Sequence, residues 1–266
     1  MTYDILMPVA ERSLTVLPLT VENAKKNLNA GRIYVAANKR LREEILQLGV
    51  DFADEDLLID GLSYDVIRDL IVARKPEAAA RTGWYLQQFL KMGYACICND
   101  PYYLVWDADT LPLKPITMFF PDGRPVFDMK QEYHPPYFQT LEALFAGTVG
   151  KTGDASYISE HMIMSVDYMK QMLAEIEDND ALPGTRWFEK IMHAVNAEDL
   201  AGSGFSEFET YGNFVETRHP GAYHYRELKT FRRGEELLSS NVSVAAKQYV
   251  FQTYDTISFE NRGSLI

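Results

Sequence analysis

The sequence predicts an α/β protein in which helices flank a mixed central sheet. Over about the first 60 residues, apolar segments of strand length alternate with segments of helix length, which is the pattern of βαβ units. A short run of aromatic and β-branched residues at 103–106 indicates a buried strand. With 47% hydrophobic and 24% charged residues, the 266-residue chain has enough apolar side chains for a sizeable core.

The first half alternates between the two kinds of element. Strands are expected in its five apolar segments: 3–9, 31–38, 50–59, 94–98 and 102–106. Helices are expected in the segments between them: 14–28, 41–48, 63–75 and 81–93. Ser63 is a typical N-cap, and Gly31 and Gly49 suit the left-handed conformation that ends a helix.

The second half carries one hairpin signal and four helical segments. Asp122 and Gly123 mark the turn of a β-hairpin expected over 116–128. Helices are expected in four segments: 140–144, 166–176, 187–195 and 235–254. The last helix would pack on the sheet or on a partner chain, which leaves a homodimer open.

The net charge of −12 argues against nucleic acid as a partner, because neutralising many phosphates requires a basic face. It does not argue against a nucleotide ligand. The N-terminus has no basic region followed by a long apolar stretch, and no apolar run approaches the ~18 residues of a membrane span. We therefore expect a cytoplasmic protein, held at most peripherally at the inner face of a membrane.

Two carboxylates, Asp107 and Asp109, directly follow the strand at 102–106. Side chains at i and i+2 of a strand point the same way, and ligands of open α/β sheets bind at the carboxyl ends of strands. Two ionised carboxylates so close together repel unless a cation lies between them. Mg²⁺ or Mn²⁺ suits oxygen ligands and can also hold a substrate's phosphates. Solvated turn aspartates are the alternative, but the apolar flanks favour a partnered pair.

The helix expected at 81–93 places an unusual set of side chains on one face. Arg81, Trp84, Tyr85 and Gln88 fall at i, i+3, i+4 and i+7. Such a face suits a base, a ribose or a diphosphate. A surface arginine over a half-buried tryptophan is the alternative.

These segments carry a family resemblance. The run from Tyr103 to Pro112, which contains Asp107-Ala108-Asp109, resembles the D-x-D segment of GT-A fold glycosyltransferases. Together with the segments 81–92 and 206–212, it is similar to a bacterial family of small glycosyltransferases from polysaccharide clusters. The similarity covers roughly residues 3–233 and implies a GT-A-like, Rossmann-like fold.

The resemblance also implies an activity, and it implies that the two halves of a single domain over 1–266 bind different substrates. It implies a hexosyltransferase-type enzyme that moves a sugar from a UDP- or GDP-sugar to a glycan or lipid-linked acceptor, in bacterial surface polysaccharide synthesis. The half at about 1–130 would bind the nucleotide sugar. The half at about 131–266 would bind the acceptor and end in a C-terminal helix.

Site residues follow from the resemblance in the same way. Asp107 and Asp109 would hold Mn²⁺ or Mg²⁺ against the donor diphosphate. The donor would be bound by seven residues in all: Pro8, Arg81, Trp84, Gln88, Asp107, Ala108 and Asp109. Glu207, after a glycine loop and a capping serine, would deprotonate the acceptor hydroxyl, with Glu209 as the second candidate. His161 and Glu160 would lie on the acceptor or metal side. An ordinary capping glutamate and a structural histidine are the alternatives.

Two other functions stay open. Residues 107–110 also fit the D-x-D-x-T nucleophile loop of haloacid dehalogenase-type phosphatases. That loop normally ends the first strand of its domain, whereas about 100 residues precede it here. The third reading is a carbohydrate-binding scaffold of the GT-A type without turnover.

Overall fold

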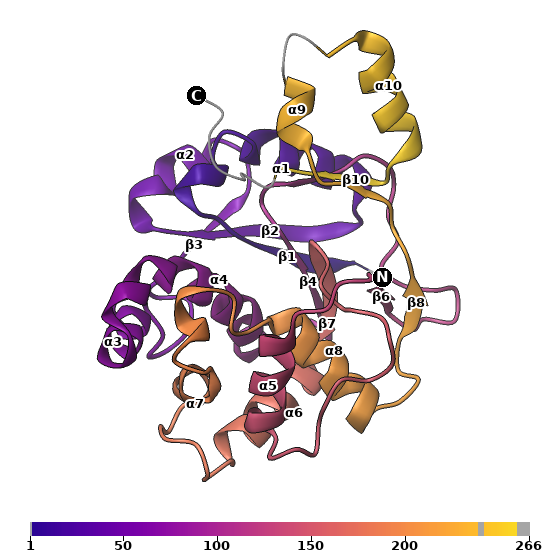
Figure 1. The fold of residues 1–266 in the computed structure, drawn as a ribbon. Helices are drawn as coiled ribbons and strands as arrows, with labels where there is room; N and C mark the ends of the chain where they lie inside the picture. The colour runs from indigo at the N-terminus through magenta and orange to yellow at the C-terminus, as the bar shows by residue number, and fades with distance from the viewer. Residues whose placement is uncertain (1, 239–241, 260–266) are drawn as a thin grey trace.

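Five strands form the central sheet of the computed structural model, which describes residues 2–238 and 242–259 (Figure 1). The sheet order is β3-β2-β1-β4-β7. Its strands are β1 (Tyr3–Pro8), β2 (Ala30–Ala37), β3 (Asp51–Asp54), β4 (Tyr102–Trp106) and β7 (His161–Ser165). The first four run parallel, and β7 pairs antiparallel with β4. The predicted class, an α/β protein with a mixed central sheet, is confirmed.

Helices cover both faces of this sheet (Figure 1). On one face lie α1 (Leu17–Asn27) and α2 (Arg42–Leu46). The other face is covered by the larger set: α3 (Tyr64–Arg74), α4 (Thr82–Gly93), α5 (Pro135–Leu144), α6 (Val166–Glu177), α7 (Trp187–Ala194) and α8 (Glu207–Arg218). Two short C-terminal helices, α9 (Gly234–Leu238) and α10 (Val244–Thr253), lie outside these layers. No helix of the described residues is both long and apolar enough to cross a bilayer.

Burial on both faces explains the sequence of the central strands. From Tyr103 to Trp106, every residue of β4 is fully buried, and β1 is nearly so. Parallel strands covered by helices on both sides read as continuous apolar runs rather than as alternating ones. Three of the helices start at a capping serine: the hydroxyls of Ser63, Ser165 and Ser206 accept backbone N–H groups at the starts of α3, α6 and α8.

The strand order reverses between β1 and β4. From β1 the chain adds β2 and β3 on one side, and it then returns to place β4 on the other side of β1. Leu6 is paired with Val105 in this central pair. Ligands of open α/β sheets bind outside the carboxyl ends of the strands at such a reversal. Pro8 ends β1 there, and Asp107 follows the end of β4.

Two small sheets pack beside the central one. One joins β5 (Thr110–Pro112), β10 (Thr256–Ser258) and β9 (Thr230–Phe231), and the other joins β6 (Val126–Asp128) and β8 (His224–Arg226). Because β5 directly follows the acidic pair, β10 brings the end of the described chain to it. The N–H of Phe259 donates to the carbonyl of Asp109 at 2.9 Å.

Several predicted elements differ from the structure. Residues 94–98 form no strand, because the N–H groups of Ile97 and Cys98 both bond to the carbonyl of Tyr94 and close a short 3₁₀ turn. The hairpin expected over 116–128 is reduced to a single bridge, since β6 pairs with β8 instead. Gly31 lies within β2 rather than capping α1, which ends in an extended residue, Leu28.

The terminal helix expected over 235–254 is divided. Within the described residues it consists of α9 and α10, and residues 239–241 of the prediction lie outside them.

Candidate active site

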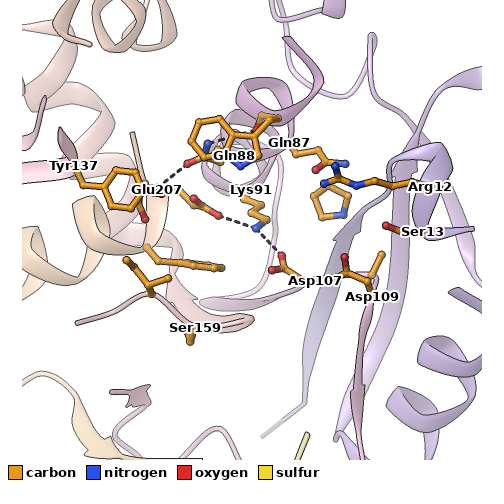
Figure 2. A pocket seen from close by; sticks show the side chains of 16 residues that line it. Arg12, Ser13, Gln87, Gln88, Lys91, Asp107, Asp109, Tyr137, Ser159 and Glu207 are labelled. Atoms are coloured by element: carbon orange, nitrogen blue, oxygen red, sulfur yellow. Dashed lines mark hydrogen bonds and ion pairs between the residues drawn. The ribbon is translucent and has the colours of Figure 1, made fainter. Parts of the chain in front are cut away.

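A pocket of about 210 Å³ lies at the reversal point of the sheet (Figure 2). Pro8 from the end of β1 and residues 107–109 after β4 form one wall. The opposite walls come from helix α4, from the start of α8 and from Tyr137 of α5. The pocket therefore combines residues from both halves of the chain.

Helix α4 supplies a polar stripe to this pocket. Trp84, Gln87, Gln88 and Lys91 fall at i, i+3, i+4 and i+7 and line the pocket. The rest of the helix, including Leu86, Phe89 and Leu90, is buried in the core. The amphipathic pattern thus directs one narrow polar face toward the reversal point.

Arg81 and Tyr85, which the sequence placed on the same face, do not line the pocket. Tyr85 is fully buried, and burial raises its pKa to about 12. The guanidinium of Arg81 lies over the Trp84 ring, 4.1 Å from its centroid, and burial lowers the pKa of Arg81. Arg81 therefore contacts the pocket through Trp84.

Lys91 is the buried cation of the pocket, with its side chain only 9% exposed. Its Nζ atom lies 2.7 Å from Oδ1 of Asp107 and 2.7 Å from Oε1 of Glu207 (Figure 2). Burial alone would lower the pKa of Lys91, but the two carboxylates outweigh it, and the pKa lies above the ordinary range. Lys91 is therefore charged at neutral pH.

The acidic pair sits in a turn that the surrounding backbone holds. The N–H of Asp107 donates to the Glu160 carbonyl at 2.9 Å, and the hydroxyl of Thr20 donates to the Ala108 carbonyl at 2.8 Å. Burial raises the pKa of Asp107, and Lys91 opposes that rise. Burial, helped by the charge of Asp107, raises the pKa of Asp109 to about 7.

The carboxylates of Asp107 and Asp109 fit a divalent cation with two protein ligands. In the described part of the chain, no lysine or arginine forms an ion pair with Asp109, although the charges of Arg12 and Lys91 oppose the rise of its pKa. Across the same residues, no group of three or more His, Cys, Asp or Glu side chains is arranged so that it could hold a metal ion. Mg²⁺ commonly uses one or two carboxylates and fills its other positions with phosphate oxygens and water.

The two acids of helix α8 have different surroundings. Ser206 caps the helix, and Glu207 follows in the first turn, where its side chain reaches the pocket and its N–H donates to Oε1 of Gln88 at 3.3 Å. Glu209 faces away from the pocket. Its carboxylate accepts from the Ser156 hydroxyl at 2.5 Å and from Asn213 at 3.0 Å, and burial raises its pKa.

His161 and Glu160 also lie outside the pocket lining. The ring of His161 stacks on Trp106 with the centroids 4.6 Å apart, and burial lowers its pKa well below the usual value. Glu160 is paired with Arg232 at 3.0 Å. The structure therefore brings together six of the predicted residues: Pro8, Trp84, Gln88, Asp107, Ala108 and Asp109, with Glu207 as a seventh.

Sequence reasoning missed several residues of the pocket: Arg12, Ser13, Gln87, Lys91 and Tyr137. Lys91 could have been found, because it lies at i+7 from Trp84 and interrupts an apolar run between Leu90 and Met92. A lysine in such a position needs a buried partner. Arg12 and Tyr137 carry no comparable local signal.

A protein-family model matches residues 47–264, which is most of the chain. Its description reads "Family of unknown function (DUF6492)". The chain belongs to the DUF6492 family. No curated protein matches this DUF6492 chain.

Two solved structures are similar to this DUF6492 member. The apo-form glycosyltransferase GlyE of Streptococcus pneumoniae TIGR4 shares 10% sequence identity with a TM-score of 0.41. That match covers 98% of this chain and 55% of the GlyE chain, so the chain spans about half the length of GlyE. An active-site mutant of LgtC shares 12% identity with a TM-score of 0.42, covering 98% of this chain and 88% of that one.

Proposed function

We propose that this protein is a glycosyltransferase that takes a sugar from a UDP- or GDP-sugar and passes it to a hydroxyl group of a glycan or lipid-linked acceptor. The observation that carries the proposal is the composition of one pocket at the reversal point of the sheet. Asp107, Asp109 and Glu207 all line it, although Glu207 comes from the other half of the chain. A glycosyltransferase needs groups that bind the sugar donor and a base for the acceptor hydroxyl in the same pocket.

The donor end of the pocket is assigned to the side of Asp109. Figure 2 shows Arg12 and Gln87 near Asp109, and Glu207 and Tyr137 at the opposite end. Arg12 supplies an exposed positive charge that suits a diphosphate. When bound by Asp107 and Asp109, Mn²⁺ or Mg²⁺ would act as a Lewis acid on the departing nucleotide.

The acceptor end is assigned to Glu207. Lys91 holds Oε1 of this carboxylate, and Gln88 accepts the backbone N–H of the same residue, so one contact fixes the side chain and the other fixes the backbone. Its second oxygen is left to take the proton of the acceptor hydroxyl as the new bond forms. The rings of Trp84 and Tyr137 line the same pocket and suit stacking on a sugar or a base.

A screen of nucleotide sugars tests the proposal. UDP- and GDP-sugars are added with and without Mn²⁺, and the unfolding temperature and the release of free nucleotide are measured. We expect one donor to give a Mn²⁺-dependent shift that Asp109→Asn abolishes. The matched control, Asp51→Asn, removes an exposed acid paired with Arg32 far from the pocket and should keep the shift.

The same screen distinguishes the proposed transferase from the two alternative functions. Turnover of p-nitrophenyl phosphate without donor hydrolysis would indicate a phosphohydrolase using Asp107. A shift without turnover on any acceptor would indicate a binding scaffold. An unchanged Mn²⁺-dependent shift of the unfolding temperature in Asp109→Asn would show that the donor binds elsewhere.

A further inference from the structure

Lys91 joins two carboxylates that come from distant parts of the chain. Asp107 follows strand β4, and Glu207 begins helix α8, yet one oxygen of each lies 2.7 Å from the same Nζ atom. The lysine is held there by more than its charge. Tyr103 of β4 donates its hydroxyl to the Lys91 carbonyl at 2.8 Å, and the Phe208 ring centroid lies 4.5 Å from Nζ.

Building on the proposed function, we propose that Lys91 is a built-in counter-ion that competes with the divalent cation for Asp107 while it holds Glu207 in position. Lys91 is a positioning residue in this scheme. It acts on the donor side by occupying Oδ1 of Asp107, and on the acceptor side by fixing Oε1 of Glu207.

The competition follows from the charges in the pocket. A cation bound by Asp107 and Asp109 would share Asp107 with an ammonium group that is almost fully buried. Like charges this close repel strongly where water is scarce. The cation therefore binds weakly by itself.

The diphosphate of the donor changes this balance. Its negative charge offsets the repulsion between the cation and Lys91, so the cation and the donor each strengthen the binding of the other. The pocket thus takes up the cation together with the nucleotide rather than before it. Lys91 remains with Glu207 throughout and keeps the base aligned.

Metal binding tests this inference without any turnover. Mn²⁺ alone is titrated into the wild type and into Lys91→Met by calorimetry, and the titration is repeated with saturating UDP. We expect Lys91→Met to bind Mn²⁺ alone about tenfold more tightly, because a competing charge is gone. We also expect UDP to improve Mn²⁺ binding less in Lys91→Met than in the wild type.

Two further variants control for charge and folding. Lys114→Met removes a lysine paired with Asp255 outside the pocket and should leave Mn²⁺ affinity unchanged. If Lys91→Met does not fold, Lys91→Met/Glu207→Gln is compared with Glu207→Gln alone. The two proteins of that pair differ only at Lys91, and both lack the Glu207 charge that Lys91→Met alone would leave buried without its partner.

The positioning role has its own readout. Lys91→Met should lower kcat with the identified donor more than it raises the KM for the acceptor, and Lys91→Arg should recover part of kcat. Equal or weaker Mn²⁺ binding in Lys91→Met would overturn the inference, although an Asp109-dependent donor site would stand. Absence of Mn²⁺ binding to the wild type, with and without UDP, would overturn both this inference and the metal site of the proposed function.

Discussion

The Nζ atom of Lys91 lies 2.7 Å from Oε1 of Glu207, although 116 residues separate the two in the chain. This contact joins helix α4 of the first half to helix α8 of the second. It is buried, with both side chains less than a tenth exposed. One contact between the halves therefore lies inside the pocket itself, so substitutions at Lys91 or Glu207 are expected to affect both the chemistry and the packing of α4 against α8.

Substitutions of the two acids of helix α8 should have different effects on kcat. Glu207→Gln is expected to lower kcat of sugar transfer by about a hundredfold or more, because a positioned base contributes that much. Its effect on donor KM should be small. Steady-state kinetics with the donor from the nucleotide-sugar screen measures both.

Glu209→Gln is the matched control two residues away. Its carboxylate lies outside the pocket and accepts hydrogen bonds from Ser156 and Asn213, so we expect lost stability of about 1–3 kcal/mol with kcat nearly unchanged. A larger loss of kcat in Glu209→Gln than in Glu207→Gln would reverse the assignment of the base.

Arg81 should affect donor binding through Trp84. The guanidinium lies 4.1 Å from the centroid of the Trp84 ring, and such a contact is worth roughly 0.5–2 kcal/mol. Arg81→Ala is therefore expected to raise the donor KM about twofold to thirtyfold at nearly constant kcat. Arg68→Ala, which removes an exposed arginine from α3, serves as the control. Equal KM values for the two variants would show that Trp84 does not depend on Arg81.

Substitution of glycine by alanine should have opposite effects on the unfolding free energy at two positions. A Cβ at Gly212 in α8 would lie 2.3 Å from the Tyr157 ring, so Gly212→Ala is expected to cost about 1–3 kcal/mol of unfolding free energy. A Cβ at Gly83 in α4 meets nothing closer than 4.0 Å, so Gly83→Ala should add about 0.5–1 kcal/mol. Urea denaturation measures both. Similar effects at the two sites would contradict the close packing of α8 on Tyr157.

Asp128 should make the protein less stable as pH rises. Burial raises its pKa from the ordinary value to about 6, so the folded state disfavours the ionised form. Its contribution to stability is complete below the unfolded pKa and is lost as pH rises through about 6.

The variant Asp128→Asn cannot ionise and removes this dependence. Relative to the wild type, it should gain on the order of 2–3 kcal/mol of unfolding free energy between pH 4 and pH 7.5. Urea denaturation of both proteins at the two pH values gives the difference. Parallel stability curves for the two proteins would show that Asp128 titrates normally.

Local signals explain the parts of the site that the sequence could predict. Ser206 caps α8 and so places Glu207 in the first turn, which needs only neighbouring residues. Asp107 and Asp109 follow a strand whose apolar run is visible in the sequence, and the structure places both in the pocket. Helix α4 begins and ends within one residue of the predicted bounds.

Contacts between distant segments explain the rest. Spacing gives the faces of α4 but not which face the core takes, and the burial of Tyr85 turns the polar stripe toward Lys91 instead of Arg81. The pairing of Lys91 with Glu207 depends on how α4 and α8 pack, which no local pattern encodes. The same limit applies at β6, whose partner β8 lies about 100 residues further along the chain.

The bond from the Phe259 N–H to the Asp109 carbonyl has a consequence for biosynthesis. The acidic turn is translated long before its last backbone partner, and N-terminal parts of a chain begin to fold while it is still being made. The turn therefore gains its full set of supports only after residue 259 has left the ribosome. A nascent chain that stops short of β10 would present the two aspartates on a turn that Thr20 and Glu160 hold but that lacks the bond from Phe259.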